Sequence, residues 1–185
     1  ANVDDTPYGG GAGMLMRPDV VSSAIESIEN RGRLIYLSPR GTPLTQAKAT
    51  ELAKESALTL LCGRFEGVDQ RVIDHYDIEE ISIGDYVLAG GEVAAQVLLE
   101  AVLRLIPGIL GEAESVAEES FATGTDYAGL LEYPHYTKPP LWNEHPVPEV
   151  LLSGHHENIK KWRKEQAEML TKARRPDMWQ RLQKK

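Results

Sequence analysis

The chain has 185 residues, of which 42% are hydrophobic and 26% are charged, and this length allows one ordinary core with a small second domain. It contains no apolar run near the roughly 18 residues of a membrane span and no basic-then-apolar leader, so we expect a cytoplasmic protein without membrane contact. Its single cysteine, Cys62, excludes an internal disulfide and agrees with a reducing compartment.

Charge is distributed unevenly along the sequence. Residues 1–154 contain 10 basic and 24 acidic residues, a net charge of −14, whereas residues 155–185 contain 10 basic and 4 acidic residues, a net charge of +6. A basic end on an acidic body favours a polyanionic partner bound at that end. A solvated amphipathic helix with a lysine-rich end explains the same charges equally well.

The first segment, residues 3–14, is rich in glycine, and no initiator methionine precedes it. It matches neither the P-loop pattern nor the G-x-G-x-x-G pattern of dinucleotide-binding loops, so a generic nucleotide-binding function has weak support. We expect the chain to begin partway through a longer fold.

Two short apolar runs, at 34–37 and 58–62, predict strands that are buried on both faces, as in a parallel sheet, and a third strand is expected at 80–83. Segments with helical spacing of apolar residues separate these runs, and Pro18 and Gly32 mark the ends of the first helix. The expected order is a helix at 18–30, a strand at 34–37, a helix at 45–56, a strand at 58–62, a short helix at 69–76, a strand at 80–83 and a helix after Glu92 that Pro107 stops.

Each predicted strand leads into a loop that contains glycine, at 38–41, 63–67 and 84–91. Parallel sheets bind ligands at the carboxyl ends of their strands, so the three loops predict a single site. These loops contain no lysine, and only the first two contain an arginine. This composition favours a ligand held by backbone groups, such as an adenine, over one held by its phosphates.

The second part of the chain differs in composition. Residues 111–129 are small and acidic and lack apolar periodicity, which is typical of a flexible linker. The proline-rich stretch 134–148 predicts irregular structure up to Val150. We therefore expect a domain at 1–110, a linker at 111–129 and a small domain at 130–185.

A last helix is expected at 157–173, ended by Arg174-Arg175-Pro176. The residues expected to face inward on it are Ile159, Trp162, Gln166, Met169 and Leu170.

No residue set predicts a metal site or a serine triad. His155 and His156 are adjacent and lack further ligands at suitable spacing, and Ser38 and Ser82 lack a G-x-S-x-G turn. The polar residues that remain near the predicted site are chiefly Arg104, Glu118 and Glu119.

The sequence also contains longer motifs, in order along nearly the whole chain. They are Asp5-x-Pro7-Tyr8-Gly9-Gly10-Gly11-x-Gly13-Met14, Tyr36-Leu37-Ser38-Pro39-x-Gly41, Cys62-Gly63-Arg64-Phe65-Glu66-Gly67-Val68-Asp69, Ser82-Ile83-Gly84-Asp85-Tyr86-Val87-Leu88-x-Gly90-Gly91-Glu92 and Pro134-His135-Tyr136-Thr137. Together they resemble the TrmD family of bacterial tRNA (guanine-N1)-methyltransferases.

The resemblance implies a SPOUT-class fold. It comprises an α/β domain with a parallel sheet and a carboxyl-terminal trefoil knot, plus a small helical C-terminal domain, and it works as a homodimer. Nothing in the periodicity predicts a knot, which is rare among folds. The family also has a strand and a helix ahead of Val3, so we expect the first domain to lack its amino-terminal strand here.

The resemblance further implies S-adenosylmethionine as the cofactor, held in the three glycine-containing loops. The residues expected to bind it are Tyr36, Leu37, Ser38, Pro39, Gly41, Gly63, Phe65, Glu66, Gly67, Ser82, Ile83, Gly84, Asp85, Tyr86, Val87, Leu88, Gly90 and Gly91.

The implied reaction methylates N1 of the guanosine immediately 3′ of the anticodon, position 37 of tRNA. Guanine N1 carries a proton at neutral pH, so the transfer needs a general base, and charge develops on O6. Glu119 stands where the family has its aspartate base, and Arg104 matches the family arginine that assists the base. The residues expected to contact tRNA are Asp5, Tyr8, Gly9, Gly10, Ser115, His135, Lys160, Arg163, Arg174 and Arg175.

Two alternatives stay open at the level of the sequence. One is another SPOUT methyltransferase that modifies a different RNA atom, and the other is a non-catalytic RNA-binding module that retains the fold. DNA is not an expected partner. A role for Mg²⁺ is compatible with the resemblance but cannot be read from these residues.

Overall fold

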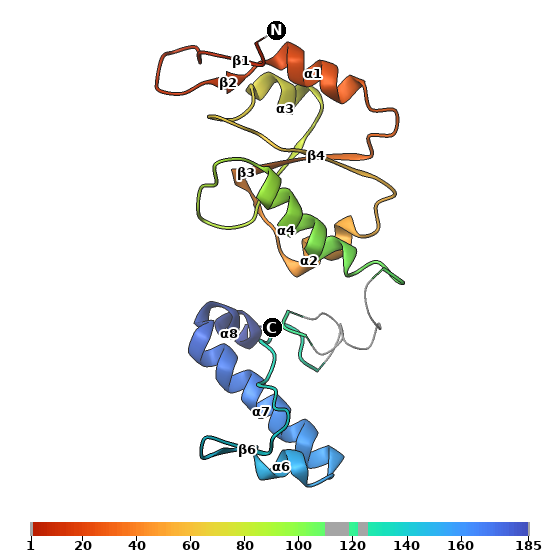
Figure 1. Ribbon diagram of the computed structural model, residues 1–185, viewed down its shortest axis with the longest axis vertical. Coiled ribbons are helices and arrows are strands. Elements are labelled where there is room, and N and C mark those ends of the chain that lie inside the picture. The colour runs from red at the N-terminus through yellow and green to blue at the C-terminus, as the bar shows by residue number, and fades with distance from the viewer. Residues whose placement is uncertain (1, 110–118, 122–125, 185) are drawn as a thin grey trace. The chain divides into compact units, whose positions relative to one another are not determined.

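The computed structural model describes residues 2–109, 119–121 and 126–184, and Figure 1 shows the path of the chain. Contacts divide the chain into two compact units, Ala1–Leu110 and Gly111–Lys185, and each unit has its own buried core. Within the described residues, no helix is long and apolar enough to cross a membrane.

A parallel sheet forms the centre of the first unit. It consists of β3 (Arg33–Pro43), β4 (Leu58–Leu61) and β5 (Glu79–Ser82), with β3 between the other two strands. Ile35 lies opposite Leu60 on β4 and opposite Glu79 on β5. The three strands occur at the three predicted strand positions, so the expected mixed α/β arrangement with a parallel sheet is confirmed.

The middle strand is longer than predicted. Leu37 and Thr42 both pair with Ile81 of β5, so the four residues between them lie outside the ladder. The prediction that the strand ends at Leu37 is wrong, because the chain returns to the sheet at Thr42. Gly41 makes this return possible, since a Cβ at this position would lie 2.4 Å from the Glu80 backbone.

Four helices accompany the sheet. Side-chain caps begin two of them, Thr45 for the second and Asp69 for the third. The first helix ends before the predicted residue 30, because the Ser27 hydroxyl donates to the Ala24 carbonyl at 2.7 Å and the chain turns away. The helices are α1 (Pro18–Glu26), α2 (Gln46–Leu52), α3 (Gln70–His75) and α4 (Glu92–Leu103).

Alternation of side chains along β3 separates two cores on opposite faces of the sheet. Ile35 and Leu37 contribute to one core, together with Leu52 of α2 and Leu98 of α4. Tyr36 contributes to the other, together with apolar residues of α1 and α3. Figure 1 accordingly shows α1 and α3 on one side of the sheet and α2 and α4 on the other. This layering places the strand-end loops between the two helix pairs.

A short hairpin precedes the sheet, β1 (Asp4–Asp5) paired antiparallel with β2 (Leu15–Met16), and the glycine-rich segment forms its loop. The sequence did not predict these strands, because two residues are too few to show any alternation. The Met16 backbone N–H donates to the Gly67 carbonyl at 2.9 Å, so β2 lies against the loop that follows β4.

The second unit is mainly helical. Its elements are β6 (Leu141–Trp142), β7 (His145–Pro146), α6 (Glu149–Leu152), α7 (His156–Arg174) and α8 (Pro176–Gln183). α7 confirms the predicted last helix. The sequence did not predict α8: Pro176 occupies its first turn, where the missing backbone N–H has no intrahelical partner to lose, and Met178 is buried.

The β6–β7 hairpin also contradicts the predicted irregular structure at 134–148. Asn143 and Glu144 form its turn with φ angles of +45° and +64°, a conformation that suits two-residue hairpins. The prolines do not prevent it, because a two-stranded ribbon consists only of edges and tolerates a missing donor.

Thr171 organises the core of the second unit. Its buried hydroxyl accepts from the Leu131 N–H at 2.8 Å and donates to the Ala167 carbonyl at 2.7 Å. Tyr127, Leu130 and Tyr133 pack around this point. Met169, expected to face inward, is instead 63% exposed, because Ala167 and Thr171 occupy the buried stripe of α7.

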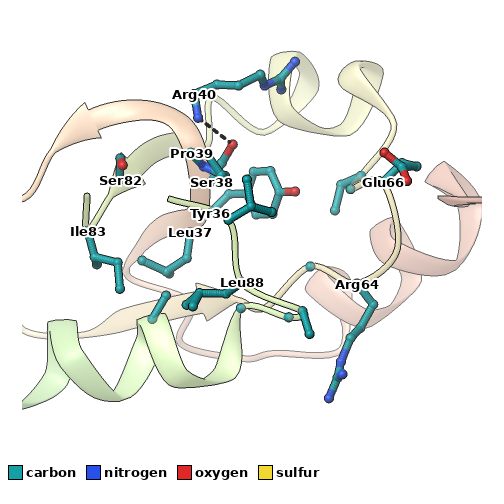
Figure 2. A pocket seen from close by; sticks show the side chains of 18 of the residues that line it. Tyr36, Leu37, Ser38, Pro39, Arg40, Arg64, Glu66, Ser82, Ile83 and Leu88 are labelled. Carbon is teal, nitrogen blue, oxygen red and sulfur yellow. Dashed lines mark hydrogen bonds between the residues drawn. The ribbon is translucent and has the colours of Figure 1, made fainter. Parts of the chain in front are cut away.

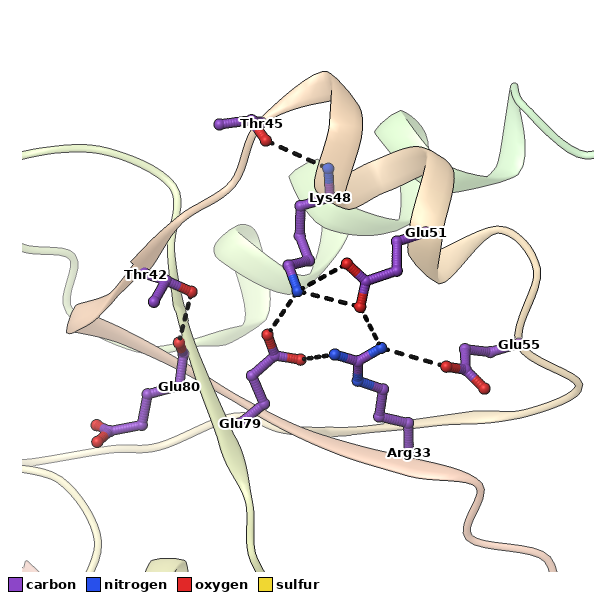
Figure 3. A network of polar contacts seen from close by, with 8 residues as sticks. All are labelled: Arg33, Thr42, Thr45, Lys48, Glu51, Glu55, Glu79 and Glu80. Carbon is purple, nitrogen blue, oxygen red and sulfur yellow. Dashed lines mark hydrogen bonds and ion pairs between the residues drawn. The ribbon is translucent and has the colours of Figure 1, made fainter.

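Five charged side chains form a network at the amino ends of β3 and β5 (Figure 3). The Arg33 guanidinium contacts Glu51 at 2.6 Å, Glu79 at 2.7 Å and Glu55 at 3.2 Å. The Lys48 ammonium bridges Glu79 at 2.9 Å and Glu51 at 3.0 Å. Hydrogen bonds from Lys48 and then Arg33 lower the pKa of the Glu51 carboxyl. The network joins α2 to both strands.

Replacing the central cation tests this network. We expect Arg33→Met to lower the free energy of unfolding by about 1 kcal/mol, measured by urea denaturation at pH 7. High salt should shrink the difference from the wild type. The pKa of Glu51 is lower in the folded protein than its unfolded value of about 4.3. The stabilisation of the fold by the ionised Glu51 carboxylate is therefore fully present above about pH 4.3, and it is lost as the pH falls through the pKa of the folded state. Arg71→Met, which removes a more exposed pair with Asp69, should change stability little. An equal loss in both variants would contradict a special role for the network.

Candidate functional site: a cavity at the carboxyl ends of the strands

A cavity of about 440 Å³ opens in the first unit, where the loops after β3, β4 and β5 meet (Figure 2). Its walls come chiefly from 36–40, 63–68 and 81–91. These are the loops that the sequence predicted to converge, and they do so because parallel strands end at the same edge of a sheet.

All but two of the residues expected to hold the cofactor line this cavity, the exceptions being Gly41 and Asp85. Gly41 instead packs on the β5 backbone, so its lack of a side chain serves the sheet. The prediction missed other lining residues. Arg40, Arg64, Val68 and Ala89 lie within or beside the motifs, whereas β2, α3 and α4 contribute Leu15, Gln70 and Ala94 without a local sequence signal.

The cavity combines an apolar wall with fixed polar groups. Leu37, Ile83 and Leu88 lie together on one side in Figure 2. The Ser38 hydroxyl accepts from the Arg40 N–H at 3.2 Å, and the Ser82 hydroxyl donates to the Gly84 carbonyl at 3.1 Å. Such an arrangement can hold a flat heterocycle between aliphatic side chains while backbone groups bind its edge.

Both arginines of the cavity already have acidic or amide partners. Arg40 donates to Glu80 at 3.0 Å and to Gln70 at 3.1 Å, and Arg64 pairs with Glu92 at 2.7 Å. Figure 2 shows the two side chains extending away from Leu37 and Ser38. A phosphate in the cavity would have to compete for these cations, so the charge distribution agrees with a ligand bound through backbone groups.

Tyr36 fixes the position of the loop after β4. A Cβ at Gly63 would lie 2.7 Å from the Tyr36 ring, and one at Gly67 would lie 2.9 Å from the phenol oxygen. Both positions therefore need glycine for the loop to pack on this ring. Burial raises the pKa of the Tyr36 phenol, so the hydroxyl stays protonated at neutral pH.

Gly91 is the point where the third loop meets the second. Its N–H donates to the Gly63 carbonyl at 3.0 Å, and a Cβ on it would lie 2.8 Å from the Cys62 Cα. The neighbouring space at Gly90 is filled by the side chains of Glu92 and Arg64. Only a glycine at 91 permits this contact between two backbones.

The residues expected to contact RNA are spread over both units. In the first unit Tyr8 is fully exposed, and Gly9 and Gly10 have positive φ angles with open space around them. Asp5 accepts a hydrogen bond from the Thr6 N–H at 2.8 Å. Ser115 lies outside the described residues.

In the second unit some of the expected RNA contacts also have structural partners. The Arg163 guanidinium lies 4.8 Å from the centre of the Tyr133 ring, and the Lys160 ammonium pairs with Asp126 at 2.9 Å. The His135 ring packs on the Tyr133 ring and contacts the Glu132 carboxylate. Arg175 forms an ion pair with Asp177, whereas Arg174 is exposed near the end of α7.

Comparison with known proteins identifies the family. The family described as "tRNA (Guanine-1)-methyltransferase TrmD" matches residues 1–181. The chain belongs to this family.

Named relatives agree with this assignment. A "tRNA (guanine-N(1)-)-methyltransferase" of Rhodospirillum rubrum is 59% identical over 180 residues, which cover 97% of the chain and 73% of the relative. A protein of the same name from Roseobacter denitrificans is 57% identical over 96% of the chain and 73% of the relative. Another, from Ruegeria pomeroyi, is 55% identical over 98% of the chain and 74% of the relative. The two alternatives of the sequence analysis find no support among these TrmD-family relatives.

The two residues expected to carry the chemistry of this TrmD-family member lie in different units. Arg104 is partly buried at the carboxyl end of α4. Glu119 is partly buried in a turn that is tied to the second unit, since the Ser120 hydroxyl accepts from the Glu132 N–H at 2.9 Å and the Phe121 N–H donates to the Leu130 carbonyl at 3.1 Å. Glu118 lies outside the described residues. The described residues contain no cluster of metal ligands.

The contact at Gly91 gives a test of the cavity in this family member. We expect Gly91→Ala to destabilise the protein by about 2 kcal/mol and to weaken cofactor binding, because the new methyl group would meet a backbone that cannot rotate away. Thermal unfolding and calorimetric titration would measure the two effects. Gly108→Ala is the control: its φ is +82° but nothing lies within 4 Å of the added Cβ, so the loss should be about 1 kcal/mol with normal binding. Equal effects of the two substitutions would rule out the proposed contact.

Proposed function

We propose that the protein binds S-adenosylmethionine in this cavity and methylates N1 of the guanosine at position 37 of tRNA, immediately 3′ of the anticodon. The observation that carries the proposal is the backbone-rich, apolar cavity formed by the TrmD motifs in a chain of the TrmD family. A tRNA substrate also accords with the expected cytoplasmic location.

The residues of the cavity fit the proposed cofactor. Leu37, Ile83 and Leu88 are suited to enclose an adenine, and the backbone of 83–91 is suited to bind its polar edge. The cofactor supplies an electrophilic methyl group on its sulfonium sulfur. The protein then has to hold the guanine N1 in line with that methyl group and remove the N1 proton.

Glu119 is proposed as the general base. Its carboxylate accepts the N1 proton as the bond from N1 to the methyl carbon forms and the bond from sulfur to that carbon breaks. Arg104 is proposed to stabilise the negative charge that develops on O6. S-adenosylmethionine bound in the cavity would supply the methyl group from its sulfonium and become a neutral thioether, so charge and protons would balance with the proton on Glu119.

The division into units supports a role for the substrate in assembling this site. We propose that residues 1–110 form the cofactor domain, that 111–129 connect it, and that the tRNA-binding domain extends over 130–185. Because Glu119 is tied to the second unit and Arg104 belongs to the first, tRNA bound to both would bring base and cofactor together. Such an arrangement makes catalysis depend on the correct substrate.

A trefoil knot is proposed for the first domain. The contact of Gly91 with Cys62 and Gly63 supports it, because a chain that passes closely against an earlier loop needs a position without a side chain. The resemblance to SPOUT proteins, not this contact, is the source of the proposal.

A homodimer is proposed from the surface of α4. Val93, Val97 and Leu103 are exposed on this helix, and Val93 and Val97 share one face because they are four residues apart. An exposed apolar strip on a helix is typical of a surface covered by a partner, here a second copy of the chain.

The reaction is tested by transfer of a tritiated methyl group to two tRNA transcripts that differ only at position 37. Transfer to the guanosine transcript and none to the adenosine transcript is expected. Transfer to both would indicate another target atom, and transfer to neither would indicate a binding module, so either result would overturn the proposal.

Glu119→Gln tests the base. We expect single-turnover methylation to fall by about 100-fold or more while cofactor affinity stays normal, because the amide keeps the shape but cannot accept the proton. Glu29→Gln, an exposed carboxylate after α1, is the control and should retain full activity. Near-normal turnover of Glu119→Gln would contradict the assignment of Glu119 as the general base.

Val97→Glu tests the dimer. We expect the variant to sediment as a monomer where the wild type sediments as a dimer, because a charge would be buried in the interface. Val3→Glu is a matched control, since Val3 is 46% exposed and Val97 is 45% exposed. A monomeric wild type, or a dimeric Val97→Glu variant, would contradict the proposed surface.

A further inference from the structure

The glycine-rich β1–β2 loop contacts the lining of the cofactor cavity at Glu66. Gly13, in this loop, lies against the side chain of Glu66, and Glu66 lines the cavity. A Cβ built on Gly13 would lie 2.4 Å from the Glu66 Cγ and 2.6 Å from Oε1. The Glu66 side chain therefore occupies the space that any larger residue at position 13 would need.

Backbone hydrogen bonds hold the two segments in this position. The Glu66 N–H donates to the Met14 carbonyl at 2.9 Å, and the Met16 N–H donates to the Gly67 carbonyl at 2.9 Å. Two residues after Gly67, the Asp69 N–H donates to the Met16 carbonyl at 3.3 Å. With both backbones fixed, an added methyl group at position 13 can be accommodated only by rotation of the Glu66 side chain.

The other glycines of the loop do not share this contact. Gly9, Gly10 and Gly11 also have positive φ angles, but no heavy atom lies within 4 Å of a Cβ at any of them. Backbone conformation accounts for glycine at these three positions, whereas Gly13 is constrained both by its φ of +90° and by Glu66.

We propose that Gly13 is a positioning residue for the cofactor site: by leaving space for the Glu66 side chain, it sets the place of that carboxylate at the rim of the cavity. Gly13 itself does not line the cavity. The inference rests on the proposed function, because it assumes that Glu66 contacts S-adenosylmethionine.

A consequence concerns the substrate. The loop that carries Gly13 also carries Tyr8, Gly9 and Gly10, which are expected to contact RNA. The two proposed binding sites therefore adjoin at Gly13 and Glu66.

The experiment measures S-adenosylmethionine binding by isothermal titration to the full chain. We expect Gly13→Ala to weaken binding by about tenfold or more, the loss expected when one charged hydrogen-bonding group is displaced. Gly11→Ala is the matched control, because it also forces a positive φ on alanine in the same loop but places no atom near Glu66, and its affinity should stay within about twofold of the wild type. Equal losses in Gly13→Ala and Gly11→Ala would overturn the proposal, as would normal binding by Gly13→Ala.

A double-mutant cycle distinguishes contact with Glu66 from a general structural effect. Glu66→Ala removes the side chain that Gly13→Ala would displace, so the double variant should bind the cofactor no more weakly than Glu66→Ala alone. Additive losses would contradict the proposal.

If Gly13→Ala does not fold, recovery of a cooperative thermal transition in the double variant supports the proposal, and failure of both variants to fold overturns it. Absence of binding by the wild type would instead overturn the proposed function itself.

Discussion

The contact between Gly91 and the peptide of Cys62 and Gly63 fixes the distance between two of the three loops that enclose the cavity. The second loop is in turn set against the Tyr36 ring by Gly63 and Gly67, and Tyr36 belongs to the central strand. A series of close contacts, first with the Tyr36 ring and then between glycine backbones, therefore runs from the sheet to the start of α4. Each added carbon along it would push the walls of the cavity apart.

The rest of the first unit keeps these contacts in place. Alternation along β3 sends Tyr36 to the face covered by α1 and α3, and sends Ile35 and Leu37 to the face covered by α2 and α4. Both faces of the strand are thus buried within a few residues of the site, which holds the backbone of 36–38 with little freedom. The charged network of Arg33 and Lys48 lies at the other end of the strands, so it stabilises the sheet without placing charge in the cavity.

The sequence predicted the sheet and the convergence of its loops because apolar runs and strand-end glycines are local signals with a clear physical cause. It did not predict the β1–β2 hairpin, whose strands are too short to alternate, or α8, because Pro176 ends one helix and begins the next. Gly41 shows a different limit on prediction from sequence. Glycine indicates that something approaches closely, but the residue alone does not say whether a ligand or another strand does so, and at Gly41 it is β5. The resemblance, more than any pattern of spacing, directed attention to Glu119.

The paired arginines of the cavity bear on the choice among adenine compounds. Arg40 is engaged by Glu80 and Gln70, and Arg64 by Glu92, while the Glu66 carboxylate adds negative charge at the rim. A nucleoside triphosphate offers the same base as the proposed cofactor but brings several negative charges, and these would meet a carboxylate and two cations that are already neutralised. The proposed cofactor carries a positive sulfonium instead. Among the many adenine compounds of a cell, this distribution of charge would favour the proposed cofactor over the nucleotides.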